Sequence, residues 1–273
     1  MKELDRIIDI YNRYGVKAQE RFSQNFLIDD KKLDVISSSL DLDKTDEIIE
    51  IGPGLGSLTK RLVNLGKKVT AVELDKDMIK VLLNEFKGVN NFNLIEGNFL
   101  NIDLNMFHVK QKSFIGNLPY SITTKLIKKV FEADYFVNFN FMVQKDIVDK
   151  LMYKENKSTN TALGVFLALK GKLEVVTDLS PSSFYPSPKV NSSFLKFTLE
   201  NELYDKYTLE LLETLFKNPR KNINNNIKNS SLKMVGKDLE RLHISPLKRP
   251  HELTLDEFRR IIALNDLYNL GEE

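Results

Sequence analysis

The segment from Ile115 to Ile127, IGNLPYSITTKLI, places an amide, a proline and an aromatic side chain together after an apolar run. A plain turn needs no more than Asn-Pro or Pro-Gly. Here Pro119 stiffens the backbone between Asn117 and Tyr120, and both of these side chains can address a flat, polar ligand. The pattern therefore predicts a site and poses the question of its ligand.

A glycine-rich loop, EIGPGLGSLTKRL, predicts a second part of that site. Gly52, Gly54 and Gly56 carry no Cβ, so a ligand can approach the main chain closely. Their G-x-G-x-G spacing differs from the G-x-G-x-x-G of dinucleotide-binding folds. Pro53 also removes one amide donor from any phosphate-binding nest. The loop favours a ligand without a pyrophosphate.

An acidic residue, Glu73, ends the next apolar run, 21 positions after Gly52. In nucleotide-binding sheets, a carboxylate at this place accepts hydrogen bonds from the ribose hydroxyls. A ribose without a pyrophosphate predicts S-adenosylmethionine as the cofactor; a nicotinamide cofactor, or a glycine turn beside a solvated acid, are the alternatives. Asn98, in EGNFLNID, is expected to read the adenine edge, although Asn at a loop start also forms turns.

Methyl transfer to an adenine amine gives the tetrapeptide a chemical role. That amine is a poor nucleophile because its lone pair is delocalised into the ring. The Asn117 side-chain oxygen and the Leu118 carbonyl can accept its hydrogens and favour a localised lone pair, and Tyr120 can stack on an extruded base. Catalysis would rest on proximity and orientation, with no general base needed before attack. The alternative is a rigid loop with a packed Tyr120.

Alternating apolar runs and helical patterns must position these residues. The expected strands lie within residues 46–52, 67–75, 92–103, 113–120 and 135–144, and the expected helices within residues 1–14, 31–42, 57–66, 76–87 and 145–154. This alternation predicts an α/β fold with a doubly wound, mostly parallel sheet. Capping signals stand at Asp29 or Asp30, and at Thr254 with Glu257.

The pattern changes towards the C-terminus. Residues 164–199 are expected to hold further strands and a Pro/Ser loop, and only helical periodicity follows from about residue 201. We predict a sheet domain over residues 1–200, which includes an N-terminal helical extension over residues 1–24, and a small all-helical domain over residues 201–273.

The composition is ordinary for a soluble globular protein, with 42% hydrophobic and 29% charged residues. No apolar run reaches the length of a membrane span, and the charged opening is no signal peptide, so we expect a cytoplasmic protein without membrane contact. The absence of cysteine excludes disulfides and thiolate metal sites. His108, His243 and His251 lack ligand spacing, so no metal is expected. No heptad pattern indicates more than a monomer.

Positive charge is concentrated between Lys217 and Arg249, where nine basic residues oppose two acidic ones for a net charge of +7. Such a concentration is typical of surfaces that bind phosphate backbones; a lysine-rich solvated surface is the alternative. The expected RNA contacts are Arg21, Lys125, Lys128, Lys129, Arg220, Lys221, Lys248 and Arg249. Basic residues mostly position the backbone, so substrate choice is expected to come from RNA shape.

Seven motifs together resemble a known family, the ribosomal RNA adenine N6-dimethyltransferases: RFSQNFLID, IEIGPGLGSLT, VELD, GNLPYSITT, FMVQKDIVDKL, FYPSPKV and PRKNINNN. They cover nearly the whole chain in the family's order. The resemblance implies a Rossmann-like, S-adenosylmethionine-dependent enzyme. It implies dimethylation of N6 on two adjacent adenosines near the 3′ end of small-subunit (16S) rRNA, with the small-subunit precursor as partner and a part in small-subunit biogenesis.

The resemblance also implies roles for single residues. The family's cofactor and catalytic positions match Asn25, Leu27, Gly52, Glu73 and Asn117. Phe184 matches an aromatic that sandwiches the target base with Tyr120; core packing is the alternative for Phe184. Ser23, Asn98 and Ser121 stand where the family usually has Gly, Asp and Asn. Since an amide at position 98 lacks charge-assisted strength, somewhat weaker cofactor affinity is expected.

Three other functions are open at this point. A relative of the same fold methylates a large-subunit adenosine and confers macrolide resistance, but the C-terminal motifs resemble the small-subunit family. A non-catalytic assembly factor would have no need for Asn117 and the glycine loop. A small-molecule methyltransferase would leave the basic helical domain unexplained.

Overall fold

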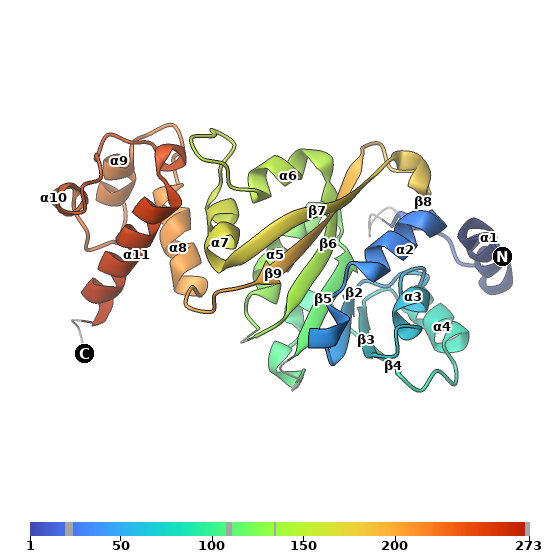
Figure 1. The fold of residues 1–273 in the computed structure, drawn as a ribbon. Helices are drawn as coiled ribbons and strands as arrows, with labels where there is room; N and C mark the ends of the chain where they lie inside the picture. The colour runs from blue at the N-terminus through green and yellow to red at the C-terminus, as the bar shows by residue number, and fades with distance from the viewer. Residues whose placement is uncertain (20–23, 108–110, 134, 271–273) are drawn as a thin grey trace. The chain divides into compact units, whose positions relative to one another are not determined.

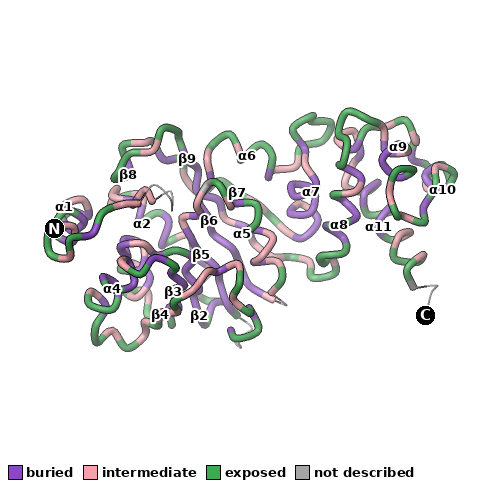
Figure 2. The backbone as a smooth tube through the Cα atoms, turned by 180° about the vertical axis from the view of Figure 1, so that it is seen from behind, coloured by how far each residue is buried: buried purple, intermediate pink, exposed green. Residues whose placement is uncertain are grey.

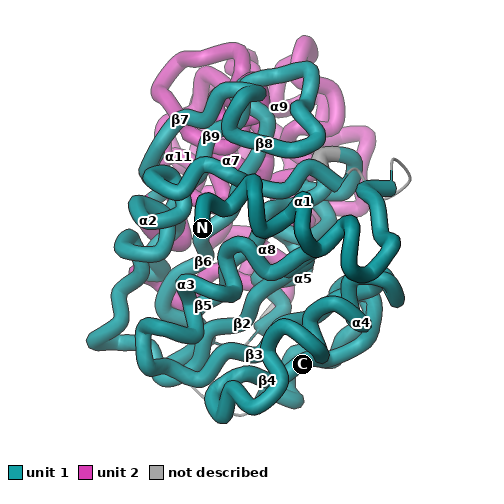
Figure 3. Tube along the Cα trace, turned by 90° about the vertical axis from the view of Figure 1, so that its right-hand side faces the viewer, with its two compact units in different colours: residues 1–145, 173–199 teal, residues 146–172, 200–273 magenta. Residues whose placement is uncertain are grey.

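The computed structural model describes residues 1–19, 24–107, 111–133 and 135–270, without the side chains of Tyr120 and Leu270. These residues fall into two compact units (Figure 3). The sheet unit comprises Met1–Lys145 and Leu173–Leu199, and the helical unit comprises Asp146–Lys172 and Glu200–Glu273. No helix in the described ranges combines the length and the apolar character that crossing a bilayer requires.

Within the described residues, seven strands form the main sheet of the first unit, in the order β4-β3-β2-β5-β6-β9-β7 (Figure 1). Their bounds are β2 (Glu47–Ile51), β3 (Lys68–Glu73), β4 (Phe92–Glu96), β5 (Lys112–Asn117), β6 (Asn138–Gln144), β7 (Gly171–Leu179) and β9 (Ser192–Leu199). β2 pairs in parallel with β3 and β5, β5 pairs in parallel with β6, and β9 runs antiparallel to β6. The α/β prediction is confirmed.

The topology predicts where a ligand binds. The chain runs outward from β2 through β3 to β4, and then returns to the other side of β2 with β5. In open α/β sheets, the crevice for a ligand lies at the carboxyl ends of the strands where the order reverses. Here that place is where β2 and β5 end, at Ile51 and Asn117.

Burial explains why these strands form the centre. All of β2 is buried, and Figure 2 shows the neighbouring central strands as mostly buried tube. Parallel strands covered on both faces are usually continuous apolar runs, yet β2 contains Glu47 and Glu50. Thr70 donates a hydrogen bond of 2.6 Å to Glu47, and Lys68 forms an ion pair of 3.0 Å with it. Glu50 belongs to the candidate site.

The remaining elements of the sheet unit are helices, short helical turns and a two-stranded pairing. The helices are α1 (Glu3–Tyr14), α2 (Asp30–Ser38), α3 (Thr59–Val63), α4 (Lys76–Glu85) and α5 (Thr123–Val130). The 3-10 turns are η2 (Leu42–Lys44), η3 (Phe99–Asn101), η4 (Leu104–Met106), η5 (Tyr120–Ile122) and η6 (Pro181–Ser183), and β1 (Phe26–Leu27) pairs antiparallel with β8 (Phe184–Tyr185). Asp29 caps α2 by accepting a hydrogen bond from the Lys32 N–H, which confirms the predicted capping signal.

The second unit is built from helices. They are α6, which begins in the sheet unit (Lys145–Leu151), α7 (Ala162–Lys170), α8 (Lys206–Leu215), α9 (Ile223–Lys228), α10 (Gly236–Arg241) and α11 (Leu255–Leu270), with the turn η7 (Pro250–Glu252). Thr254 and Glu257 form the expected capping box before α11, with backbone-to-side-chain hydrogen bonds of 2.9 and 3.1 Å.

The division differs from the domain boundary expected at residue 201, because residues 146–172 join the helical unit. The cause is α7, which packs against α8 and α11. Its sequence, ALGVFLALK, is buried along nearly its whole length and is apolar on all sides. Within residues 164–199, where the sequence predicts further strands and a loop, residues 164–170 are instead helical, and the strands begin with β7 at Gly171. An apolar run without periodicity does not separate a buried helix from a buried strand.

Candidate active site

A cavity of about 280 Å³ lies in the sheet unit, where β2, β3 and β5 end. It brings together most residues that the sequence predicts for the cofactor and the catalytic loop: Asn25, Leu27, Gly52, Gly54, Glu73, Asn98, Asn117 and Pro119. Gly56, Leu118 and Phe184 are not among its lining residues. Sequence segments that are far apart in the chain therefore meet at one edge of the sheet, as the parallel topology requires.

The glycine loop turns its open side to the cavity. Gly52 has a φ of +67°, and a Cβ added there would meet nothing within 4 Å, so free space borders this part of the backbone. Gly54 has a φ of +57°, and an added Cβ would come within 2.8 Å of the Phe26 ring. Both positions require glycine, because L-residues with a side chain rarely adopt a positive φ. Gly56 instead lies against Phe86.

Glu73 is held by backbone donors. Its Oε1 accepts from the N–H groups of Leu74 and Asp75 at 2.8 Å each, and its Oε2 accepts from Gly54 N–H at 3.0 Å. Burial raises the pKa of this carboxyl, and the three N–H donors oppose that rise. An ionised carboxylate accepts about four hydrogen bonds. One acceptor position is left, so a pair of ribose hydroxyls would have to displace one N–H donor.

Glu50 is a wall residue that the sequence reasoning missed. It is 2% exposed, and Thr59 Oγ1 donates to its Oε2 at 2.6 Å. Burial raises its pKa to about 8, the Thr59 hydrogen bond opposes the rise, and the negative charge of Glu73 adds to it. The available signal was an acid within the apolar run before the glycine loop. A cation in the cavity would favour the ionised form.

Ser57 is a second residue that the sequence reasoning missed. It lies on the cavity wall at the end of the glycine loop and is 6% exposed. Within the described residues, its Oγ is buried and has no hydrogen-bond partner. A hydroxyl in this position is available to a ligand.

The catalytic loop has a defined amide orientation. Asn117 Nδ2 donates to the Asn25 carbonyl oxygen at 3.0 Å, so Oδ1 is the atom left to accept a hydrogen bond. The Pro119 carbonyl accepts from Thr123 Oγ1 and from Ile122 N–H at 3.1 Å each, which fixes the turn into α5. The side chain of Leu118 is 1% exposed. The predicted stacking residue, Tyr120, has a side chain outside the described part of the chain.

Phe184 is a core residue in this structure and does not border the cavity. It is 2% exposed and belongs to a buried cluster with Leu27, Leu33 and Ile36. In the two-residue strand β8, side chains alternate, so the next residue, Tyr185, is 39% exposed and its ring lies 5.8 Å from that of Tyr11. The position beside a target base that the resemblance implied is not found, and core packing describes Phe184.

Asn98 serves two purposes. It borders the cavity, and its Oδ1 accepts from Leu100 N–H at 3.1 Å, which caps η3. Asn98 is therefore a turn former, which was the alternative interpretation, and also a residue of the cavity wall. An oxygen that accepts one hydrogen bond keeps a second lone pair for an adenine amino group.

The predicted RNA contacts differ in their surroundings. The side chains of Arg220, Lys221 and Arg249 are exposed and form no ion pair in the described parts of the chain, although the backbone N–H of Arg249 donates to the Glu252 carboxylate at 2.7 Å. Lys248 forms an ion pair with Glu257, and Lys129 forms one with Glu132, both at 2.6 Å. Lys125 and Lys128 lie on α5, whereas Arg21 lies outside the described residues. In those ranges, no group of three or more acidic or histidine side chains is arranged to hold a metal.

A family model described as ribosomal RNA adenine dimethylase matches residues 15–264. The chain belongs to this family. The expected enzyme class, an S-adenosylmethionine-dependent methyltransferase, and its cofactor are thereby confirmed.

Curated relatives and a solved structure agree with this assignment. A protein of Clostridium acetobutylicum named ribosomal RNA small subunit methyltransferase A is 34% identical, over 92% of this chain and 95% of that protein. A protein of the same name from Hahella chejuensis is 36% identical, over 90% of this chain and 92% of that protein. The crystal structure of a dimethyladenosine transferase from Plasmodium falciparum matches with a TM-score of 0.76 and 24% identity, over 88% of this chain and 97% of that chain, and shows the same fold.

Proposed function

We propose that this chain transfers methyl groups to N6 of two adjacent adenosines near the 3′ end of small-subunit rRNA, within an assembling small subunit. In this proposal it acts as a cytoplasmic monomer and contributes to small-subunit biogenesis. The orientation of Asn117 carries the proposal, because its Nδ2 is bound to Asn25 and its Oδ1 is left as an acceptor at the cavity. An acceptor there suits an amine substrate.

The residues around the cavity fit S-adenosylmethionine. The open space beside Gly52 allows close approach to the main chain, and Glu73 offers a ribose acceptor on the same wall. Asn25, Leu27 and Asn98 complete the proposed contacts. When bound, the cofactor supplies an electrophilic methyl group on a positively charged sulfur. Glu50, beside this cavity, is the acid whose ionisation a cation would promote.

The catalytic loop then acts on the adenine amine. Asn117 Oδ1 and the Leu118 carbonyl accept its hydrogens, which keeps the nitrogen lone pair out of the ring and directed at the methyl group. Pro119 holds the two acceptors in a fixed relation. As the new C–N bond forms, the bond between the methyl carbon and the sulfur breaks and its electron pair stays on the sulfur. The nitrogen thereby becomes positively charged, so its proton is acidic and passes to water without a general base. Tyr120 is proposed to stack on the base.

The names of the relatives support the small subunit as the target. The Clostridium and Hahella proteins are both named small subunit methyltransferases. Sequence similarity over 90–92% of the chain supports the same target here against a large-subunit resistance enzyme. Asn117 with a free acceptor argues against a purely non-catalytic factor.

The test measures methyl transfer from labelled S-adenosylmethionine to unmethylated small subunits, large subunits and naked rRNA. We expect dimethyladenosine in small subunits alone. Asn117→Ala should lower the rate at least about 100-fold, as loss of one positioned polar group does in other enzymes, while binding of S-adenosylhomocysteine stays within about threefold. Asn93→Ala, at an exposed position of β4, is the matched control.

Two outcomes would contradict the proposal. Label in large-subunit rRNA would assign the chain to the resistance type of activity. Tight binding of small subunits with no label in any RNA would assign it to non-catalytic assembly.

A further inference from the structure

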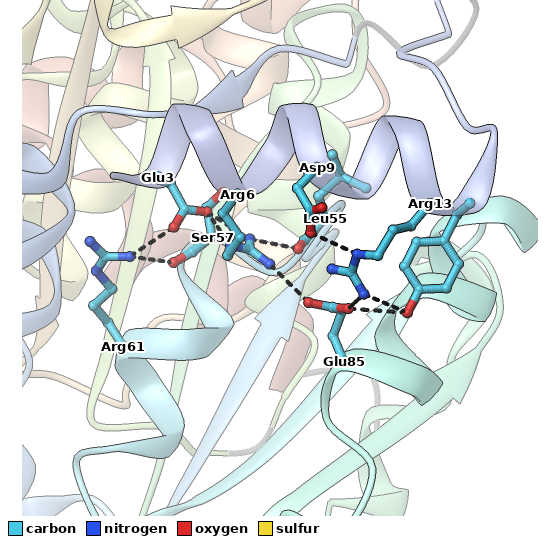
Figure 4. Close-up of polar contacts among 9 residues, drawn as sticks. Glu3, Arg6, Asp9, Arg13, Leu55, Ser57, Arg61 and Glu85 are labelled. Atoms are coloured by element: carbon cyan, nitrogen blue, oxygen red, sulfur yellow. Dashed lines mark hydrogen bonds and ion pairs between the residues drawn. The ribbon is translucent and has the colours of Figure 1, made fainter. Parts of the chain in front are cut away.

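The N-terminal helix α1 is attached to the glycine loop by a buried arginine (Figure 4). Arg6 is 5% exposed, and its Nη2 donates to the Leu55 carbonyl oxygen at 2.9 Å. The same guanidinium donates to Glu3 Oε1 from Nε at 2.9 Å and from Nη2 at 2.6 Å. Burial of an arginine is tolerated only when its charge and donors are satisfied, and here a loop carbonyl is one of the partners.

The attached peptide is part of the cavity. Leu55 lies between Gly54 and Gly56, and its side chain is 0% exposed in a cluster with Ile7 and Ile10 of α1. On the cavity side, the preceding residue donates its N–H to Glu73 at 3.0 Å. A short series of contacts therefore connects Arg6, through Leu55 and Gly54, to the proposed ribose-binding carboxylate.

Further ion pairs tie α1 to the helices that follow the two cofactor motifs. Glu3 pairs with Arg61 of α3, the helix after the glycine loop, at 3.3 Å. Glu85 of α4, the helix after Glu73, forms an ion pair of 3.0 Å with Arg13 and one of 3.8 Å with Arg6. Figure 4 shows Glu3, Arg6 and Arg13 pointing from one side of α1 towards these partners.

This arrangement addresses a weakness of the loop. Glycine residues with positive φ give the loop its approach to the ligand, but glycine loses more backbone entropy on ordering than any other residue. Contacts from outside the loop can supply the order before the cofactor arrives, and a preorganised site binds more tightly. Figure 4 shows that these contacts come from α1.

We propose that Arg6 is a positioning residue for cofactor binding and that α1 holds the glycine loop in its binding conformation. The inference rests on the proposed cofactor site and extends it to a helix outside the cavity. It assigns a role in cofactor affinity to the first turns of the chain, which contribute no residue to the cavity wall.

The test compares Arg6→Met with Arg13→Met in the full chain. Both variants remove a guanidinium from α1, and both lose a contact with Glu85, but only Arg6 reaches the loop. We expect Arg6→Met to weaken S-adenosylhomocysteine binding about tenfold by calorimetry, and Arg13→Met to stay within about twofold. The KM for S-adenosylmethionine should rise with Arg6→Met while kcat stays within about twofold. Amide exchange should accelerate in residues 52–58.

A second variant keeps the test valid if Arg6→Met does not fold. Glu3→Gln with Arg6→Met removes both buried charges together, so neither is left without its partner. We expect this variant to fold and to show the same tenfold loss of affinity. Unchanged affinity in both folded variants, or a drop in kcat at unchanged KM, would overturn the inference. Failure of the wild-type protein to bind S-adenosylhomocysteine would instead remove the cofactor site on which the inference rests.

Discussion

Charged side chains around the cavity are buried and hydrogen-bonded, whereas three of the basic side chains in the helical unit, those of Arg220, Lys221 and Arg249, are exposed. Glu50 and Glu73 are 2% and 7% exposed, and each accepts hydrogen bonds from fixed protein donors. Within the described residues, the three basic side chains form no ion pair with a carboxylate. The cavity therefore fixes its charged groups by burial and hydrogen bonds, whereas these three basic side chains are left to solvent.

The difference separates two kinds of work. A buried group has one geometry and a strong dependence on its neighbours, because low dielectric enlarges each interaction. Exposed lysines and arginines contribute small, salt-sensitive increments to the binding of a phosphate backbone. Methyl transfer to one nitrogen atom needs buried groups in a fixed geometry, whereas binding to a large RNA surface needs only exposed basic side chains. Single substitutions should have large effects at the cavity and small ones on the basic surface.

The largest expected effect concerns Glu50 and pH. Its pKa is raised from 4.5 to about 8 by burial, so the folded state keeps a proton that the unfolded state releases. Stability from this group is complete below about pH 4.5 and is lost as pH rises towards 8. Between pH 6 and pH 9, the wild type without cofactor should lose about 3 kcal/mol of unfolding free energy relative to Glu50→Gln. Urea denaturation across this range measures the difference.

The control for this prediction is Glu96→Gln, which removes one negative charge at the exposed end of β4. It should follow the wild-type pH profile, because an exposed carboxylate is hydrated in both states. Parallel pH profiles for the wild type and Glu50→Gln would show that burial does not govern this group and would weaken the contrast between the two regions.

The second prediction concerns the exposed surface. The triple variant Arg220→Ala, Lys221→Ala and Arg249→Ala should weaken binding of small-subunit rRNA about tenfold at moderate salt. The slope of log affinity against log salt should become shallower by about 2, at about 0.7 for each lost phosphate contact. Affinity for S-adenosylhomocysteine should stay unchanged. Filter binding over a salt series measures the RNA terms.

A matched triple variant removes the same charge from exposed positions of the sheet unit: Lys31→Ala, Lys60→Ala and Lys87→Ala. It should keep most of the wild-type RNA affinity. If both triple variants lose the same affinity, net charge decides binding, and the basic stretch between Lys217 and Arg249 has no special part in it.

The local sequence is sufficient to predict features that depend on residue type, spacing and strand order. The glycine loop, the acid at the end of β3 and the amide at the end of β5 could be placed at one edge from strand order alone. Asp29 and the pair Thr254 and Glu257 were identified as caps from residue type and spacing. In each case the partner lies within a few residues, or at the end of a parallel strand.

The rest depends on contacts between distant segments. Phe184 turns inward because β8 pairs with β1, which lies far away in the sequence. Residues 162–170 form a helix because the partner helices α8 and α11 cover an apolar run that carries no period of its own. The hydrogen bond from Arg6 to Leu55 spans 49 positions. None of these contacts can be predicted from the sequence of one of the two partner segments alone.

The smallest expected effect concerns Asn98, a residue on the cavity side of this comparison whose side chain also caps η3. Asn98→Asp keeps an oxygen for the Leu100 N–H and offers a charged acceptor to the adenine amino group, so S-adenosylhomocysteine should bind about threefold more tightly at pH 7.5. The gain is small because Glu73, itself an acid, lines the same cavity and its negative charge opposes a further one. Asn93→Asp, exposed on β4, adds the same charge away from the wall and should leave the affinity unchanged. Equal or weaker binding by Asn98→Asp in calorimetry would mean that the capping role alone occupies this side chain and that adenine is read elsewhere.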